Sequence, residues 1–252
     1  MGKADEYRKI LGNLNQWDDY LRSHSGLPGP RGNLELAQVV ADDGEKALFE
    51  RYASLTPEIA PENTPDAFLA FCGVVGLGRL AAEGQKANIG RLRKLASDPR
   101  WRIREAVAMA LQRLGEKDMD LLLEEVEKWS LGGALEQRAA AAAVCEPRLL
   151  NNDKHSRRTL SLLDKITASI GRNKDRKCGE FIALRKGMGY CWSVAVASNP
   201  GIGKKLMEKW MTSKDKDIRW IMKENLRKNR LIKKDAKWVG EMERKLGECA
   251  VP

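Results

Sequence analysis

The clearest candidate for a functional surface is a row of basic side chains near the C-terminal end of the chain. From Lys214 onward, basic residues and one tryptophan recur at steps of three or four, the spacing that places side chains on one face of an α-helix. Such a stripe can follow a nucleic-acid backbone, with the indole available for stacking on a base. A solvated charged face over a core tryptophan is the alternative. The residues of the stripe are Lys216, Trp220, Lys223, Arg227, Arg230 and Lys234.

Other basic and aromatic residues are candidates for the same surface. Helix phase alone adds four arginines to the nucleic-acid-binding set: Arg102, Arg113, Arg138 and Arg148. The chain has seven tryptophans but four phenylalanines. Three of the tryptophans lie near the starts or middles of the predicted second helices of pairs, either as aromatics of a binding groove or as packing residues: Trp101, Trp192 and Trp220.

Little in the sequence points to catalysis, a metal or a cofactor. The two histidines, His24 and His155, lie in no nucleophile or metal-ligand motif. The five cysteines are scattered without a CxxC pair, which favours reduced intracellular thiols that pack as small apolar groups. These are Cys72, Cys145, Cys178, Cys191 and Cys249. We therefore expect no cofactor and no bound metal.

Two glycine-rich segments resemble phosphate loops only in part. The Gly26–Asn33 segment could present Arg31 and backbone amides to an anion, or could be a turn between helices. The PGIGKK segment at Pro200–Lys205 lacks the first glycine and the Ser or Thr of a P-loop. We interpret this second segment as a helix start.

Composition and net charge limit the kinds of partner that the chain can bind. The chain has 252 residues, 42% hydrophobic and 32% charged, with a net charge of +10. This balance favours an anionic partner: nucleic acid first, then an acidic protein surface or an anionic membrane. The alternative is a basic protein that binds no nucleic acid, as many soluble proteins are. The N-terminus has no apolar signal region, and the apolar stretch Ala67–Leu77 is too short to cross a bilayer. A cytoplasmic protein without a membrane partner is the expectation.

Helical periodicity runs through the chain, and its clearest segment is Ser97–Gly115. Asp98 and Pro99 suit a helix N-cap and first turn, and Gly115 suits a C-cap. Apolar residues recur at helical spacing between them: Ile103, Val107, Ala110 and Leu114. A preceding helix carries Ile89, Leu92 and Leu95.

The Ser97–Gly115 segment closely resembles the HEAT repeat. The resemblance lies in Asp-Pro, a branched apolar residue with Arg, and an alanine-rich helix that ends in Leu and Gly: Asp98, Pro99, Ile103, Arg104, Ala106, Ala110, Leu111, Leu114 and Gly115. In that family the Asp and Arg form a ladder between repeats, which implies structural roles for Asp98 and Arg104. The implied fold is an all-α superhelix, a HEAT-like solenoid of the armadillo type.

Weaker copies of the pattern follow Ser97–Gly115, and the N-terminal third is helical but repeat-like only in outline. Predicted helices cover Asn33–Tyr52, Pro65–Ala82, Asp120–Trp129, Ala134–Val144, Arg157–Ile170, Arg176–Ser198, Ile202–Thr212 and Ser213–Leu231. They give roughly six helix pairs, near the period of about 40 residues that this class shows. We expect a single domain over residues 1–252, with atypical capping helices in 1–82 and better-defined repeats in 83–252.

A second resemblance is to the alkylpurine DNA glycosylases built on HEAT-like repeats, carried by chain length, basic charge and the segment Asp217–Leu231. That family implies a basic cleft for duplex DNA, with a carboxylate that stabilises positive charge on the sugar. The family places an aspartate one turn after a cleft tryptophan. Here glutamates, Glu105 and Glu224, follow Trp101 and Trp220, and they are the positions left for a catalytic role.

The sequence therefore predicts a non-catalytic binding module that contacts the phosphates of duplex DNA along a basic concave face. A scaffold for an acidic protein segment and a DNA-repair glycosylase are the two alternatives. Fold class does not choose among them.

Overall fold

A computed structural model describes residues 2–248 of the chain. Within that range the regular structure is helical, with 14 α-helices, one short 3₁₀ turn and no strand. The predicted all-α class is confirmed. Packing contacts divide the chain into two compact units that meet in sequence between Lys117 and Asp118. The boundary predicted at residues 82 and 83 falls inside the first unit.

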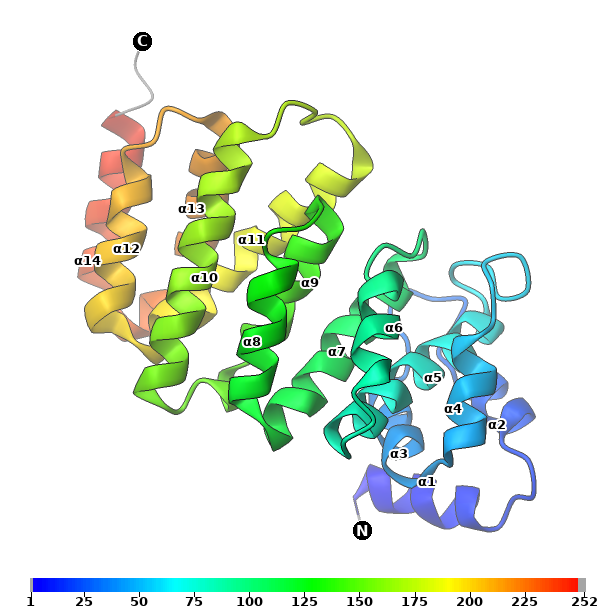
Figure 1. The fold of residues 1–252 in the computed structure, drawn as a ribbon. Helices are drawn as coiled ribbons and strands as arrows, with labels where there is room; N and C mark the ends of the chain where they lie inside the picture. The colour runs from blue at the N-terminus through cyan, green and yellow to red at the C-terminus, as the bar shows by residue number, and fades with distance from the viewer. Residues whose placement is uncertain (1, 249–252) are drawn as a thin grey trace. The chain divides into compact units, whose positions relative to one another are not determined.

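The first unit is built around one buried helix. Its helices are α1 (Lys3–Gly12), α2 (Asp18–Ser23), α3 (Leu34–Asp43), α4 (Lys46–Ala53), α5 (Pro65–Ala82), α6 (Ala87–Leu95) and α7 (Trp101–Lys117). Helix α5 packs against α2, α3, α4, α6 and α7 (Figure 1). Its start is set by Thr64, whose hydroxyl accepts the Ala67 N–H at 3.2 Å, and by Pro65 in the first turn.

Glycines let neighbouring helices approach α5 closely. A Cβ on Gly78 would lie 2.4 Å from the Ala110 Cα of α7, and one on Gly76 would lie 2.2 Å from the Phe49 ring of α4. By length and composition α5 could cross a membrane, yet 78% of it is buried inside the unit. It is the core helix of this unit.

The second unit is a stack of helix pairs in two layers. Its helices are α8 (Met119–Trp129), α9 (Ala134–Val144), α10 (Asp153–Arg172), α11 (Gly179–Ser198), α12 (Pro200–Met211), α13 (Lys216–Leu226) and α14 (Asn229–Glu248). Helices α8, α10 and α12 pack side by side in one layer, and α9, α11 and α13 do so in the other. Figure 1 shows α10 and α12 in front of α11 and α13. Helix α14 packs on α11, α12 and α13.

Buried polar contacts join the helices of this unit. The Asn225 amide is fully buried, donates to the Met188 and Ile221 carbonyls at 2.8 Å, and accepts from the Ser193 N–H at 2.8 Å. Because each of these groups has a partner, the contact fixes α13 on α11 without a desolvation penalty. The buried Trp192 likewise donates from Nε1 to Thr167 of α10 at 3.0 Å.

Several helices match the sequence-based bounds. Pro65–Ala82 and Ala134–Val144 are confirmed as α5 and α9, and Pro200 begins α12, as expected of the PGIGKK segment. The predicted Asn33–Tyr52 helix is instead broken at Gly44 and Glu45, whose backbones are extended, and a Cβ on Gly44 would lie 2.7 Å from the Phe49 ring.

The predicted ends of the Ser97–Gly115 helix are wrong. The helix begins at Trp101, so Pro99 is not its first residue, although the Asp98 carboxylate accepts from the Arg100 N–H at 2.8 Å, as a capping side chain does, and from the Arg100 guanidinium at 2.8 and 2.9 Å. Gly115 is buried within α7, which continues to Lys117. The break comes at Asp118, which caps α8 through the Leu121 N–H at 2.9 Å.

The predicted basic stripe is divided between two helices. Helix α13 ends at Leu226, and α14 begins at Asn229, so Arg230 and Lys234 do not continue the α13 face. Leu226 and Leu231, which flank the turn, are both buried.

Candidate nucleic-acid interface

The excess positive charge of the chain lies in one part of the sequence. Residues 151–252 hold 25 of the 45 Lys and Arg residues but only 12 of the 35 Asp and Glu residues. The first 150 residues hold the other 20 basic and 23 acidic residues, so they are slightly acidic. An anionic partner is therefore attracted to α10–α14, in the second unit.

The exposed side of the α9–α11–α13 layer gathers part of this charge. We define the basic face as Arg138, Lys186, Tyr190, Trp220, Lys223, Arg227 and Arg230, which are all partly or fully exposed. Close helix packing brings them together. A Cβ on Gly187 would lie 3.2 Å from the Arg138 Cγ, and one on Gly189 would lie 3.1 Å from the Trp220 ring. The missing side chains on α11 let these two residues lie across it.

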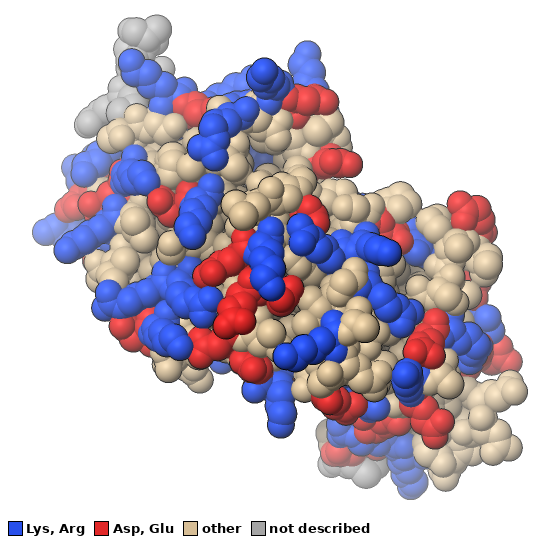
Figure 2. Space-filling view, in the orientation of Figure 1, with Lys and Arg blue, Asp and Glu red and all other residues tan. Residues whose placement is uncertain are grey.

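The opposite side of the unit is different in charge. Figure 2 shows the side of α8, α10 and α12, where basic and acidic side chains are interspersed. Ion pairs join them: Asp120 accepts from Lys154 at 2.9 Å and from Arg158 at 3.1 Å, and Asp164 accepts from Lys209 at 3.0 Å. Cations on that side are largely balanced within the unit.

Arg185 and Arg230 of the second unit lie closely over aromatic rings. The Arg185 guanidinium is 4.3 Å from the Trp220 ring centre, and the Arg230 guanidinium is 4.5 Å from that of Tyr190, whose hydroxyl accepts its hydrogen bond. Stacking restricts each guanidinium to a plane, which reduces the entropy lost when it donates to a phosphate. Because the arginines cover one face of each ring, this geometry favours phosphate contacts over base stacking.

A buried carboxylate holds Arg185 in place. Asp217, 3% exposed, accepts from Arg185 at 2.7 Å and from Arg176 at 3.0 Å. Arg176 also donates to Asp215, the N-cap of α13, at 2.8 Å. Burial alone would raise the pKa of Asp215, but hydrogen bonds from Arg176 and from the backbone N–H groups of Ile218 and Asp217 outweigh it and lower the pKa. These contacts join α11, α13 and the loop before α11.

Two neighbouring cavities share Lys216 and Trp220 as a common wall. One, of about 500 Å³, lies beside the loop at residues 174–177 and is lined further by Arg176 and Arg185. The other, of about 430 Å³, lies towards α14 and is lined by Arg219, Lys223, Glu243, Leu246 and Gly247. Both volumes are in the range of small-ligand sites, about 300–1,000 Å³.

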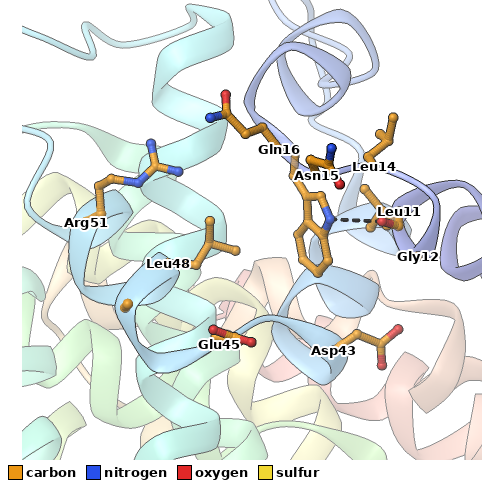
Figure 3. A pocket seen from close by; sticks show the side chains of 11 residues that line it. Leu11, Gly12, Leu14, Asn15, Gln16, Asp43, Glu45, Leu48 and Arg51 are labelled. Carbon is orange, nitrogen blue, oxygen red and sulfur yellow. Dashed lines mark hydrogen bonds between the residues drawn. The ribbon is translucent and has the colours of Figure 1, made fainter.

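A third cavity, of about 610 Å³, lies in the first unit (Figure 3). Leu14, Asn15 and Gln16 line it from the segment after α1, and Leu48 and Arg51 from α4. Trp17 also lines it and donates from Nε1 to the Leu11 carbonyl at 3.0 Å, the dashed bond in Figure 3.

The charge of this third cavity does not suit a nucleic acid. Its carboxylates are Asp43 and Glu45, and its single cation, Arg51, already makes two hydrogen bonds to Asp18, at 2.6 and 2.8 Å. Since Arg51 is neutralised by Asp18, and Asp43 pairs with Arg8 at 3.4 Å, the cavity offers an anionic backbone no unpaired cation, and Glu45 adds a negative charge.

Of the sequence-predicted residues, those of the first unit are held in structural contacts. Arg102 is 5% exposed and donates to the Gly29 carbonyl at 2.7 Å. Arg113 donates to Asp42 at 2.6 Å and to the Gln38 side chain at 2.5 Å. Both arginines hold loops and helices of their own unit, and their donors do not face solvent as a phosphate contact requires.

The predicted residues of the second unit are partly brought together. Lys216, Trp220, Lys223 and Arg227 follow one face of α13, Arg138 approaches from α9, and Arg230 from α14. Lys234 is exposed on α14, and Arg148 pairs with Glu146 at 3.2 Å in the turn after α9.

The remaining aromatic and acidic candidates differ in their burial and in their contacts. Trp192 is fully buried in the core, whereas Trp101 is 43% exposed in the first unit, with Arg102 over its ring at 4.6 Å. Glu224 pairs with Arg227 at 2.7 Å, and Glu105 is half-buried on α7.

The structure also describes four of the cysteines and the Gly26–Asn33 segment. Cys72, Cys145 and Cys191 are buried as unpaired thiols, whereas Cys178 is partly exposed and caps α11; Cys249 lies outside the described residues. The Gly26–Asn33 segment connects α2 to α3; the Asn33 N–H donates to the Ser25 carbonyl at 2.9 Å, and the Asn33 side chain accepts the Leu36 N–H and caps α3. Among residues 2–248 no group of three or more His, Cys, Asp and Glu side chains is placed to hold a metal.

Sequence reasoning missed Lys174, Lys177, Arg185, Lys186 and Tyr190. The i, i+4 spacing of Lys186 and Tyr190 on a predicted helix could have placed those two on one face. No local pattern pairs Arg185 with Trp220, because that contact depends on how α11 packs on α13.

No known protein family matches this chain, no curated protein resembles it in sequence, and no solved structure matches its fold.

Proposed function

We propose that this protein binds nucleic acid, with duplex DNA as the preferred form, through phosphate contacts on the basic face of its second unit. The observation that carries the proposal is the gathering of exposed basic side chains on the α9–α11–α13 side, where Lys186 and Lys223 have no ion pair among the described residues. The opposite side mixes and pairs its charges. Electrostatic attraction of this kind supplies most of the affinity of sequence-independent DNA binding.

We further propose that the second unit is a short HEAT-like repeat array. Support comes from the pairwise stacking of α8–α9, α10–α11 and α12–α13, in which each layer contacts its neighbours. Arg185 of α11 reaches Asp217 of α13, a link between the second helices of successive pairs. It resembles the Asp–Arg ladder of HEAT repeats in chemistry, although its arginine is not the one that the motif predicts.

The proposal predicts a steep dependence of affinity on salt. The basic face and Lys216 offer about five cations that could each neutralise a phosphate, so log K should fall with log salt at a slope of about −4 to −5. A partner held mainly by apolar contacts would show little salt dependence. Fluorescence anisotropy with a random-sequence duplex over a salt titration measures this slope.

A charge-reversal pair tests where the DNA lies. Lys186→Glu with Lys223→Glu changes two exposed lysines of the basic face and should reduce the slope by about 2, because two phosphate contacts are lost. The matched control is Lys165→Glu with Lys205→Glu, two exposed lysines on α10 and α12. The control has the same net charge and should keep nearly the full slope.

Two results would overturn the proposal. One is no measurable binding to the duplex even at low salt. The other is an equal loss of affinity in both double variants, since that would show a response to net charge alone and not to this face.

A further inference from the structure

The cavity beside the loop at residues 174–177 has a surplus of positive charge that its own carboxylates do not balance. Arg176 and Arg185 are matched by Asp215 and Asp217, within 3.0 Å of their guanidinium nitrogens. Arg176, Arg185 and Asp217 line the cavity, and together with Asp215, which pairs with Arg176, they carry no net charge.

Three lysines remain on the rim. Lys174, Lys177 and Lys216 are exposed, and among the described residues no ion pair to them is found. The remaining carboxylate, Asp175, accepts backbone N–H groups of Lys177 and Cys178 at 3.3 and 3.2 Å. Three positive charges against one negative leave a surplus of two.

A surplus of two charges matches a phosphomonoester better than a backbone phosphate. A phosphate on a strand end carries about −1.5 to −2 at pH 7, whereas a diester within a strand carries −1. The size of the cavity agrees, because about 500 Å³ holds a nucleotide-sized group but not a duplex that continues on both sides.

The wall shared with the second cavity gives the rest of a nucleotide a place to lie. Trp220 and Lys216 line both cavities, and the second is lined also by Leu246 and Gly247. A phosphate held by the lysines would have its sugar or base beside this partly apolar surface. Trp220 lines the 174–177 cavity and also belongs to the basic face. The cavity therefore lies at the edge of the surface to which we assign the strand.

We propose that the 174–177 cavity binds a phosphomonoester dianion, supplied by the terminal phosphate of a nucleic-acid strand that lies on the basic face. The source of the phosphate rests on the proposed function, whereas the chemistry of the cavity does not.

The test compares short duplexes of one sequence that end in hydroxyl groups, a 5′-phosphate or a 3′-phosphate. The full chain should bind one phosphorylated duplex about tenfold more tightly than the hydroxyl duplex, or about 1.4 kcal/mol. Lys174→Gln with Lys177→Gln should abolish that preference. Lys186→Gln with Lys223→Gln should weaken binding to all the duplexes and keep the preference.

A second arm separates this proposal from the proposed function. Titration of a nucleoside 5′-monophosphate into the full chain, by calorimetry, probes the cavity without DNA. Nucleotide binding that is lost in the Lys174/Lys177 variant supports a phosphomonoester site in the cavity, even if no duplex binds. In that case a free nucleotide, and not a strand end, is the source of the phosphate. Equal affinity for all duplexes together with no nucleotide binding overturns the proposal, as does a preference that survives in the Lys174/Lys177 variant.

Discussion

Replacement of Asp217 by alanine should destabilise the second unit and release the arginine that lies on Trp220. The carboxylate is 3% exposed and accepts from Arg185 at 2.7 Å and from Arg176 at 3.0 Å. Removal of one partner from a fully buried ion pair costs about 3–5 kcal/mol. Here the two arginines keep 24% and 29% of their side-chain surface exposed and can be rehydrated, so we expect about 2–3 kcal/mol.

Calorimetry of the full chain measures this loss. For a unit of this size, each kcal/mol lowers the midpoint by about 3–4 °C, so the transition of the second unit should fall by roughly 6–12 °C. Asp217→Asn should lose less, because the amide oxygen still accepts one hydrogen bond. Glu127→Ala removes a half-exposed partner of Arg158 and should cost under about 1 kcal/mol. A shift for Asp217→Ala no larger than that of Glu127→Ala would refute the reasoning.

Two further predictions concern the first unit. The hydrogen bonds from Arg51 lower the pKa of Asp18 to about 2. A lowered carboxyl pKa stabilises the fold above the unfolded value of about 4, so the stability lost in Asp18→Asn should be largest near neutral pH and should vanish as pH falls towards 2, measured from urea midpoints. Gly78→Ala should destabilise the first unit by about 1–3 kcal/mol, because the new Cβ would lie 2.4 Å from the Ala110 backbone. The control Gly90→Ala, whose Cβ would have nothing within 4 Å, should be neutral or stabilising. Equal thermal midpoints for the two variants would contradict this prediction.

Local patterns were enough to predict most helices. Thr64 and Pro65 mark the start of α5, and the alanine-rich run Ala134–Val144 gives α9, since capping and periodicity depend on neighbours in sequence. The end of α13 was not predictable in this way. Lys-rich sequence continues helical spacing past Leu226, although α13 ends there and α14 begins at Asn229.

The candidate site was predictable only in its α13 part. Lys216, Trp220 and Lys223 share a helix, so their common face follows from spacing. Arg102 has the same residue type and helix phase as a surface candidate, yet it is buried by the Gly26–Asn33 turn, whose Gly29 carbonyl it binds. Such long-range contacts decide whether an arginine is structural, and no local pattern carries them.

The placement of carboxylates in the second unit supports an external anion as the partner of its lysines. Folding gains from ion pairs wherever acidic and basic side chains can meet, and on the α8–α10–α12 side Asp120 alone accepts from both Lys154 and Arg158. On the other side, the buried Asp217 fixes arginines, while the lysines around the cavity have no carboxylate of the described chain as a partner. Like charges held together this way repel and lower stability. A bound phosphate removes that cost, so the free energy of binding includes relief of repulsion, and the ligand should raise the melting temperature of the second unit more than that of the first.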